Sequence, residues 1–581
     1  MDSSGKRQLV PRRTVRRLRV LALAGALAVA GCTAGDPEQP PAATEEAPAV
    51  LLSDLAAGQR EVLAGSGSET SVAMSRALFE RSPVAVVFAR HDDEGYARTD
   101  AGLGPAASAA AGLHVPLLVL GPGGAGLAEV TAELDRLDVE TVVGYGDPAA
   151  DWPVLRGERE MLAGPMTVAD FSSSLRLPAT AVGVGPDAIV ASVSALESEA
   201  LQVLDVTQPE SPAAPSSSPP GDLSDPATTD VLPEFRAPDQ PSPALVLATA
   251  TSTPASLATA RAAGAEVQVL PDGDPRSTPA AVRAVHAHAQ APILAVGDGF
   301  GPADRFTARV GAAATGVELP GGGQTVFPGR RMVALYGHPS GPSLGALGEQ
   351  DIDATMARVR ELAAQYQPFS DEPVVPALDL IASVASSDPG PDGDYSNETP
   401  IDVLEPWIEA ADEAGVYVIL DFQSGRTDFL SQVRRYEELL ARPSVGLALD
   451  PEWRLAPDQV PLEQIGTVGA AELNATSTWL ADLTRDRALP QKLFMVHQFR
   501  VDMISGREDL DVSRSELAIT LHADGHGTPG EKLETWGALQ GVMPRGIWPS
   551  WKNFYDEDKP MLTPAQTYTL IDPKPWLVTY Q

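Results

Sequence analysis

The sequence predicts an α/β protein in which an N-terminal parallel-sheet α/β region precedes a C-terminal (β/α)₈ barrel of the TIM type. First, 581 residues are too many for one hydrophobic core, so we expect at least two domains. Second, short apolar runs alternate with Ala-rich helical segments before residue 325, which is typical of parallel sheets with crossover helices. Third, eight apolar runs separated by amphipathic segments follow Arg330 within about 250 residues, as a (β/α)₈ barrel requires.

The first 31 residues have the pattern of an export signal. A basic segment, GKRQLVPRRTVRRLR (5–19), precedes VLALAGALAVA (20–30), an apolar stretch too short to span a bilayer. The stretch ends in Val-Ala-Gly-Cys at Cys32, which resembles the lipobox of bacterial lipoproteins, and Cys32 is the only cysteine in the chain. The resemblance implies that residues 1–31 are removed and that the acylated Cys32 anchors the protein. We therefore expect an exported protein, lipid-anchored to the outer face of the bacterial cytoplasmic membrane and facing the cell wall.

The charge of the chain excludes one class of partner. Its formal net charge is −36 at pH 7, and no lysine lies between Cys32 and Pro490. Nucleic-acid binding depends on neutralising phosphates with basic side chains, so we expect no nucleic-acid partner. A membrane is expected as a partner only through the N-terminal lipid.

Two low-complexity segments divide the chain. Residues 32–64 begin with a Pro/Ala/Glu-rich stretch, which predicts a tether, and residues 207–243 are acidic and rich in Pro and Ser, which predicts a disordered insertion. Around that insertion we place an α/β region at residues 65–325. We place the barrel at residues 330–581.

The α/β region contains a degenerate repeat. The apolar runs and helical segments of residues 82–148 recur in the same order in residues 242–301. Two stretches, GSGSETSVAMSRALFERSPVAVVFA (65–89) and AASAAAGLHVPLLVLGPG (106–123), resemble the bacterial cell wall-binding repeat 2 family. The resemblance implies a parallel-sheet α/β fold and a cell-wall or envelope glycan as the partner.

One motif in this region has two interpretations. GPGGAG (121–126) follows an apolar run and satisfies G-x-G-x-x-G, with Asp147 about twenty residues later, so it could be a dinucleotide site or a Gly-rich strand-to-helix turn. Because an exported protein meets no free NAD pool and Pro122 is atypical of the fingerprint, we favour the turn. We therefore expect no cofactor.

The eight barrel strands are predicted from apolar runs that end in polar or aromatic residues. The runs are residues 331–338, 372–380, 415–423, 444–452, 491–499, 515–524, 544–552 and 575–580. In barrels of this type the chemistry lies at the C-terminal ends of the strands. Besides Asp379, which ends the second run, the ends of the runs and the residues just beyond them supply the candidate substrate-binding residues Tyr336, His338, Asp421, Gln423, His497, His522, Asp524, Trp551, Lys552, Tyr555 and Tyr580.

The fourth run supplies the candidate catalytic pair. Asp450 and Glu452 follow the apolar run VGLAL and lie two residues apart, so an extended backbone would place both on one face. This Asp-x-Glu is similar to the motif at the same strand of chitinase-like and lysozyme-like (β/α)₈ glycoside hydrolases. The resemblance implies that Glu452 is the general acid and that Asp450 tunes it. Trp453 and Trp548 are additional candidates for stacking against sugar rings.

Three alternatives stay open from the sequence. Asp450 could simply cap the following loop, with the tryptophans packing in the core. The barrel could bind an envelope glycan without cleaving it. A metal-dependent hydrolase is the third alternative, because His338, His497, His522 and Asp524 could converge on one ion, although no metal is assigned.

Overall fold

The computed structural model describes residues 47–90, 101–146, 152–206 and 231–581. The predicted signal peptide and Cys32 lie outside the described residues, as do residues 207–230 of the predicted insertion and Asp147. Among the residues that the structure describes, no helix is both long and apolar enough to cross a membrane.

Two predicted segment boundaries need correction. Residues 47–64, predicted to belong to the tether, are ordered, and β2 (Arg60–Leu63) pairs in parallel with β12 (Ile293–Val296). The last residues of the predicted insertion are also ordered, since Leu232 is buried and Arg236 exchanges backbone hydrogen bonds with Pro48 and Val50. Low-complexity composition therefore overestimates the length of both unstructured segments, because their ordered residues form backbone hydrogen bonds with residues far away in the sequence.

The N-terminal region contains two four-stranded parallel sheets in which three consecutive strands have the same order, while the fourth strand follows them along the chain in one sheet and precedes them in the other. One sheet runs β5-β4-β6-β7 and the other runs β11-β10-β12-β2, so the predicted repeat of residues 82–148 and 242–301 is confirmed as parallel α/β structure. A parallel pair, β8 and β9, and a short antiparallel pair, β1 and β3, complete the region. The strands are β1 (Leu51–Leu52), β3 (Phe79–Arg81), β4 (Val84–Ala89), β5 (Leu117–Leu120), β6 (Thr141–Gly146), β7 (Glu160–Ala163), β8 (Thr180–Val184), β9 (Gln202–Val206), β10 (Leu245–Thr249) and β11 (Glu266–Leu270).

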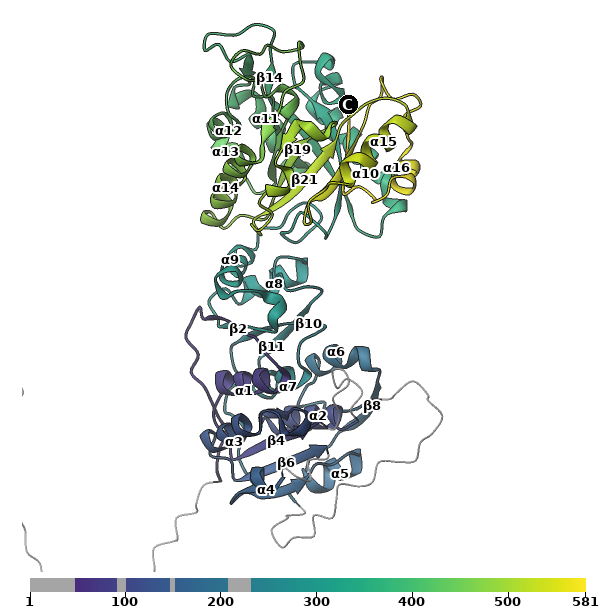
Figure 1. The fold of residues 1–581 in the computed structure, drawn as a ribbon. Coiled ribbons are helices and arrows are strands. Elements are labelled where there is room, and N and C mark those ends of the chain that lie inside the picture. The colour runs from purple at the N-terminus through teal and green to yellow at the C-terminus, as the bar shows by residue number, and fades with distance from the viewer. Residues whose placement is uncertain (1–46, 91–100, 147–151, 207–230) are drawn as a thin grey trace, which may run out of the picture. The chain divides into compact units, whose positions relative to one another are not determined.

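Small residues allow the helices of this region to approach one another closely. Helices α1, α2 and α7 lie between the two four-stranded sheets (Figure 1), and α2 is Ala-rich and buried along nearly its whole length. A Cβ at Gly104 of α2 would collide with the carbonyl oxygen of Leu204 on β9, so only glycine fits there. The helices are α1 (Gly67–Leu78), α2 (Leu103–Leu113), α3 (Leu127–Arg136), α4 (Trp152–Arg156), α5 (Val168–Ser174), α6 (Ile189–Ser194), α7 (Pro254–Ala262), α8 (Pro279–Ala287) and α9 (Ala303–Ala313).

The C-terminal region is a closed barrel of eight parallel strands, as predicted. Strand β13 pairs with β14 on one side and with β23 on the other, which closes the sheet. A short strand, β15 (Ser396–Glu398), extends β14 in antiparallel orientation, and β18 (Val468–Gly469) pairs with β20 (Ile504–Ser505) outside the barrel. The barrel strands are β13 (Arg331–Gly337), β14 (Val374–Ala385), β16 (Tyr417–Phe422), β17 (Val445–Leu449), β19 (Lys492–His497), β21 (Leu517–Ala523), β22 (Trp548–Asn553) and β23 (Leu577–Tyr580).

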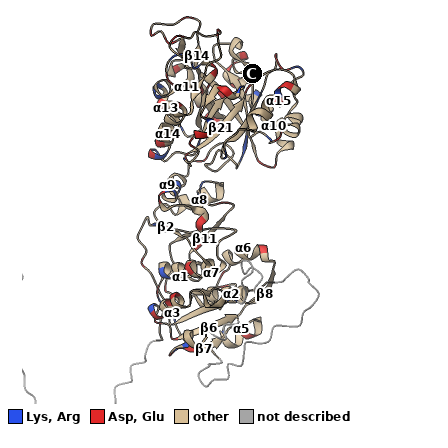
Figure 2. Ribbon diagram, viewed as in Figure 1, with Lys and Arg blue, Asp and Glu red and all other residues tan. Residues whose placement is uncertain are grey.

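Amphipathic helices surround the barrel strands (Figure 1). Several begin at side-chain caps: Asp351 accepts a hydrogen bond from the backbone of α10, and Thr528 and Thr563 form capping boxes on α15 and α16. The helices are α10 (Ile352–Tyr366), α11 (Ile401–Ala414), α12 (Phe429–Val433), α13 (Glu437–Leu440), α14 (Ala470–Asp486), α15 (Pro529–Gln540) and α16 (Pro564–Leu570). Acidic positions occur on the barrel strands as well as on these helices (Figure 2).

Alternation along the strands separates two apolar layers. Outward-facing side chains pack against the helices, while inward-facing ones such as Met332, Ile419 and Met495 form a separate core inside the barrel. Leu319 and Phe327 belong to the inner core although they precede β13. The segment that carries them therefore closes the N-terminal end of the barrel, and polar side chains are left for the C-terminal end.

Candidate functional site

Each barrel strand contributes one inward-facing side chain to the C-terminal end of the barrel, and we call these eight residues the mouth ring. Seven lie on the strands, and Asp450 follows the last residue of β17. All eight are buried. The mouth ring consists of Tyr336, Asp379, Asp421, Asp450, His497, His522, Lys552 and Thr579.

Two histidines and a carboxylate form a connected group on one side of the ring. His497 Nδ1 lies 2.9 Å from Oδ2 of Asp524, which follows β21. His522 Nδ1 lies 3.4 Å from the same nitrogen of His497, and its Nε2 lies 3.0 Å from the Thr579 hydroxyl. Asp524 therefore fixes the orientation of the His497 ring and leaves its Nε2 facing the opposite side of the mouth.

Two aspartates on that opposite side have no hydrogen-bond partner among the described residues. Both carboxylate oxygens of Asp379 and both of Asp421 are buried and unpartnered, and so is Nε2 of His497. Asp421 Oδ2 lies 3.7 Å from that nitrogen. Buried polar atoms in folded proteins nearly always have partners, so this concentration of exceptions makes the mouth the candidate functional site.

Burial and crowding shift the pKa values of the acidic groups upward. Burial, followed by the charge of Asp421, raises the pKa of Asp379 to about 7. Burial likewise raises the pKa of Asp421, and it raises that of Asp450 well above the usual range. Burial therefore favours the protonated, neutral forms of these three carboxyl groups.

The pKa values of the two histidines shift in opposite directions. Burial opposes the charge of His497, but the carboxylates of Asp421 and Asp524 outweigh it and raise the pKa of His497 to about 10. Burial and the neighbouring His497 charge lower the pKa of His522 well below its ordinary value. One imidazolium therefore lies beside one neutral imidazole.

The predicted catalytic pair is arranged differently from the prediction. Asp450 caps the short helical turn Pro451–Trp453, because its Oδ1 accepts a hydrogen bond of 3.0 Å from the backbone N–H of Glu452. The backbone is therefore not extended through the pair, so the two carboxyl groups do not share a strand face. Glu452 is half-buried, and burial together with the charge of Asp524 raises its pKa. Glu452 is thus the partly exposed acid of the pair. The buried Asp450 positions it by accepting the hydrogen bond from its backbone N–H.

Lys552 and Tyr336 complete the mouth on the side of β22 and β13. Lys552 Nζ lies 3.6 Å from the centre of the Tyr336 ring, close enough for a cation–π interaction. Gln423 Nε2 donates to the Tyr336 hydroxyl over 3.1 Å, and Gln423 Oε1 accepts from the backbone of Ala385. These predicted residues do lie together with the acidic groups.

Three aromatic residues do not lie at the mouth, and the predictions for them are wrong. Trp551 and Tyr580 have only 1% of their surface exposed and belong to the outer apolar layer, where Trp551 packs on Trp536 and the Tyr580 hydroxyl lies 2.6 Å from that of Tyr366. Each lies one residue from an inward-facing neighbour, so it points outward. Trp548 begins β22 and packs against the inner core at the opposite end of the barrel.

Two other predicted residues lie beside the mouth ring. His338, in the loop after β13, places its two ring nitrogens 2.8 Å from the Ser340 and Thr399 hydroxyls. Tyr555 is 37% exposed and packs on the Tyr580 ring. Neither contacts the acidic cluster through a hydrogen bond among the described residues.

The sequence prediction omitted two members of the ring. The predicted site residues include neither Asp379, although it lies at the end of the second apolar run, nor Thr579. The alternation of faces could have identified both, since Asp379 follows the inward-facing Ala377 by two residues and Thr579 follows Leu577.

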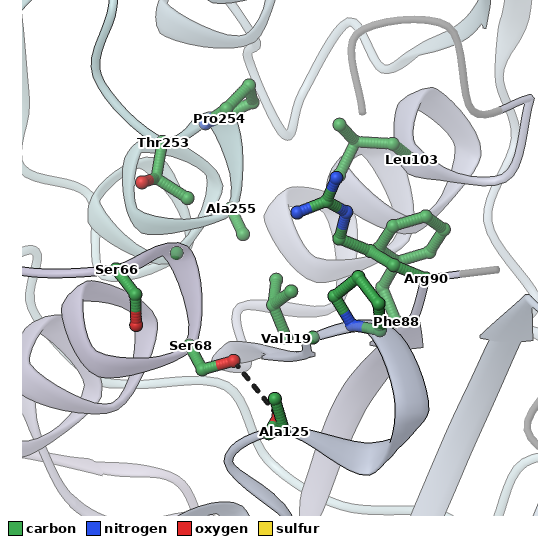
Figure 3. A pocket seen from close by; sticks show the side chains of 13 residues that line it. Ser66, Ser68, Phe88, Arg90, Leu103, Val119, Ala125, Thr253, Pro254 and Ala255 are labelled. Carbon is green, nitrogen blue, oxygen red and sulfur yellow. Dashed lines mark hydrogen bonds between the residues drawn. The ribbon is translucent and has the colours of Figure 1, made fainter. Parts of the chain in front are cut away.

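A separate cavity of about 310 Å³ lies in the N-terminal region (Figure 3). Its lining is mostly apolar and includes Phe88, Val119 and residues of the GPGGAG motif, whose Ala125 carbonyl accepts a hydrogen bond from Ser68. The motif joins β5 to α3 through a turn with Gly123 and Gly126 at positive φ. It therefore forms the strand-to-helix turn that the sequence analysis favours.

Comparisons with known proteins add little to the assignment. No family model matches the sequence, and no curated protein matches it either. Solved structures do match, among them Cwp6 from Clostridium difficile, with a TM-score of 0.30 and 13% sequence identity over 57% of this chain and 64% of that chain. The match spans less than two thirds of the Cwp6 chain, and at this level of similarity it assigns no function. The resemblances to the cell wall-binding repeat 2 family, to lipoproteins and to glycoside hydrolases stay predictions.

Proposed function

We propose that this chain is an exported, lipid-anchored cell-envelope protein whose barrel mouth cleaves an envelope glycan by carboxylate acid–base chemistry. One observation carries the proposal: ionisable side chains from seven of the eight strands converge at the C-terminal end of a closed parallel barrel. Burying charges there costs stability, so their concentration supports a role in chemistry rather than in packing.

Glu452 is the proton donor in this proposal. Glycosidic cleavage needs one carboxyl group that is protonated and a second that is ionised. Burial raises the pKa of Glu452, and its half-exposed position lets it reach a substrate. Asp524 supplies the second carboxyl group, because His497 donates to it over 2.9 Å.

Asp450 acts through Glu452 as a positioning residue. Its carboxylate holds the backbone N–H of Glu452 and so fixes the turn from which that side chain projects. Trp453, which follows Glu452 in this turn and is half-buried, is the aromatic residue best placed to contact a sugar ring.

The experiment compares Glu452→Gln with Glu463→Gln, an exposed glutamate in the loop that follows. Release of reducing ends from peptidoglycan, chitin and arabinogalactan-type glycans is measured for both variants and the parent. Glu452→Gln should lower the rate by about 10²–10⁴-fold, as expected for loss of a general acid, while Glu463→Gln leaves it unchanged. Both variants should unfold at the parent temperature.

The parent protein's own behaviour separates cleavage from binding. A parent that is retained on purified peptidoglycan but releases no reducing ends from any of these glycans would support a non-catalytic glycan-binding protein instead. A parent that neither binds nor cleaves them would overturn the carbohydrate assignment.

Lipid anchoring rests on the sequence alone, since Cys32 lies outside the described residues. Stable attachment to a bilayer needs more than one acyl chain, so we propose multiple acylation at Cys32. Cys32→Ser should yield an uncleaved precursor without lipid, which mass spectrometry detects. A mature parent chain that begins at another residue would contradict the proposal.

A further inference from the structure

We infer that the barrel mouth binds a divalent transition-metal cation through the carboxylates of Asp379 and Asp421 and the Nε2 atom of His497. This site goes beyond the proposed glycan chemistry and stands on different residues from Glu452. It assigns a ligand to the unpartnered atoms at the centre of the ring.

The donor atoms are arranged as a cation site requires. One ligand atom from each of the three side chains lies within 4.8 Å of the others, and the three side chains come from β14, β16 and β19. All three residues are 0% exposed, and neither aspartate has a hydrogen-bond partner among the described residues. A buried carboxylate without a partner is costly, and a bound cation removes that cost for both aspartates at once.

A second, independent feature orients the histidine. Metal-binding histidines usually donate their other ring N–H to a carboxylate, which fixes the tautomer and aims the free nitrogen at the metal. His497 Nδ1 lies 2.9 Å from Asp524 Oδ2, and the unpartnered Nε2 faces Asp421 at 3.7 Å. Asp524 is therefore the positioning residue for the ligand.

Another grouping of nearby donors is less suitable. His497, His522 and Asp524 also bring their donor atoms within 4.8 Å of one another. In that group His497 Nδ1 is already paired with Asp524, and His522 also contacts Thr579 over 3.0 Å. The ligand atoms that lack hydrogen-bond partners are the carboxylate oxygens of the two aspartates and Nε2 of His497, on the other side of the His497 ring.

The ligand set indicates the class of metal. Two carboxylates favour hard divalent cations, and an imidazole nitrogen favours Zn²⁺ and other transition metals over Mg²⁺ or Ca²⁺. We therefore choose Zn²⁺ as the probe, with Mn²⁺ as the second cation. Binding at Nε2 would displace the proton that the His497 imidazolium holds there, and the two positive charges of the cation would balance the two aspartates.

The test uses the full-length chain, produced in Zn²⁺-supplemented medium because the ligands are fully buried. Metal content is measured on the purified protein, and affinity is measured by competition with a chromophoric chelator. We expect one bound equivalent in the parent. The nearly isosteric Asp421→Asn and Asp379→Asn variants should lose the bound metal ion. Asp524→Asn should bind the metal about 10–100-fold more weakly, as expected for loss of a residue that orients a ligand.

The chain offers a matched control for these variants. Asp392, Asp394 and Glu398 form another acidic group with donor atoms at similar spacing, but Asp392 is exposed. Asp392→Asn should keep the full equivalent. Substitution by Co²⁺ provides a second readout, since its visible absorption should change in His497→Gln if the imidazole is a ligand.

Three results would overturn the inference: a parent that retains no metal after exposure to Zn²⁺ and to Mn²⁺, folded Asp379→Asn and Asp421→Asn variants that bind as the parent does, or metal that is lost only in His522→Gln. Circular dichroism confirms the fold of each variant before binding is measured. Because metal content is measured without a glycan, failure of the glycan proposal leaves this result unaffected, and failure here leaves the Glu452 test unaffected.

Discussion

The two ends of the barrel are built from the same eight strands but have opposite chemistry. At the N-terminal end the inward-facing side chains are apolar, and Phe327 packs against both Trp548 and Trp576, with ring centres 5.7 and 5.6 Å away. At the C-terminal end the inward-facing residues are those of the mouth ring, and several of their polar atoms are unpartnered.

This difference separates stability from function within one core. The buried charges of the mouth reduce stability, because desolvation is only partly offset by His497 and Lys552. The apolar end contributes the hydrophobic burial that offsets this cost. Substitutions at the N-terminal end should therefore affect folding, whereas those at the mouth should affect chemistry.

The largest effect is expected from removing the segment that closes the N-terminal end. Leu319, Val326 and Phe327 belong to the inner core, and Val326 N–H donates to Gln491 Oε1 over 2.8 Å. A chain of residues 318–581 should unfold cooperatively in urea, whereas residues 328–581, which lack all three, should not. Equal cooperativity of the two chains would show that the segment is dispensable.

Phe327→Ala tests the same end with a single side chain. Removing a buried aromatic ring should lower the free energy of unfolding by about 3–5 kcal/mol, because a cavity remains beside the two tryptophans that Phe327 contacts. Phe369→Ala is the control, since Phe369 is 38% exposed and should change stability by less than about 0.5 kcal/mol. Chemical denaturation measures both, and Phe327→Ala should leave metal content unchanged.

Lys492, near the N-terminal end on β19, should make stability depend on pH. Burial lowers the pKa of Lys492 to about 7, and its amine donates to the carbonyls of Arg442 and Val445 over 2.8 Å. Between about pH 7 and 10.5 the unfolded chain holds a proton at this site that the folded chain lacks, so the stability contribution rises with pH and is lost as pH falls toward 7.

The measurement is the difference in unfolding free energy between the parent and Lys492→Met. This difference should increase in favour of the parent by up to about 1.4 kcal/mol per pH unit between pH 7.5 and 9.5. His497, with its pKa raised to about 10, acts in the opposite direction but cancels in the comparison because both proteins contain it. A difference that stays constant across this range would mean that Lys492 remains charged in the folded protein.

The smallest effect is expected for Tyr580→Phe, just outside the mouth. It removes the hydroxyl that lies 2.6 Å from that of Tyr366, so the free energy of unfolding should fall by about 1 kcal/mol. Metal content and glycan cleavage should not change, because the side chain faces the outer layer. Loss of bound metal or of glycan cleavage in a folded Tyr580→Phe protein would show that Tyr580 belongs to the site.

Most of the barrel could be predicted because its signals are local. Each predicted apolar run overlaps a barrel strand, although β14 and β22 extend beyond their runs, and polar residues at the run ends identified six of the eight members of the mouth ring. Trp551 and Tyr580 also end apolar runs, but adjacent residues of a strand face opposite sides, and their inward-facing neighbours Lys552 and Thr579 occupy the mouth.

The sequence by itself determined that this protein is α/β, where the barrel strands lie and that acidic groups gather at their ends, since periodicity and composition act over a few residues. Only the tertiary structure decided that Asp450 caps a turn, that Asp524 pairs with His497 and that the buried carboxylates of Asp379 and Asp421 lack hydrogen-bond partners. These relations join side chains from separate strands, and they depend on how the closed sheet brings the strand ends together. Burial then shifts the pKa values, because the protein interior, unlike the linear sequence, excludes water from the charged groups.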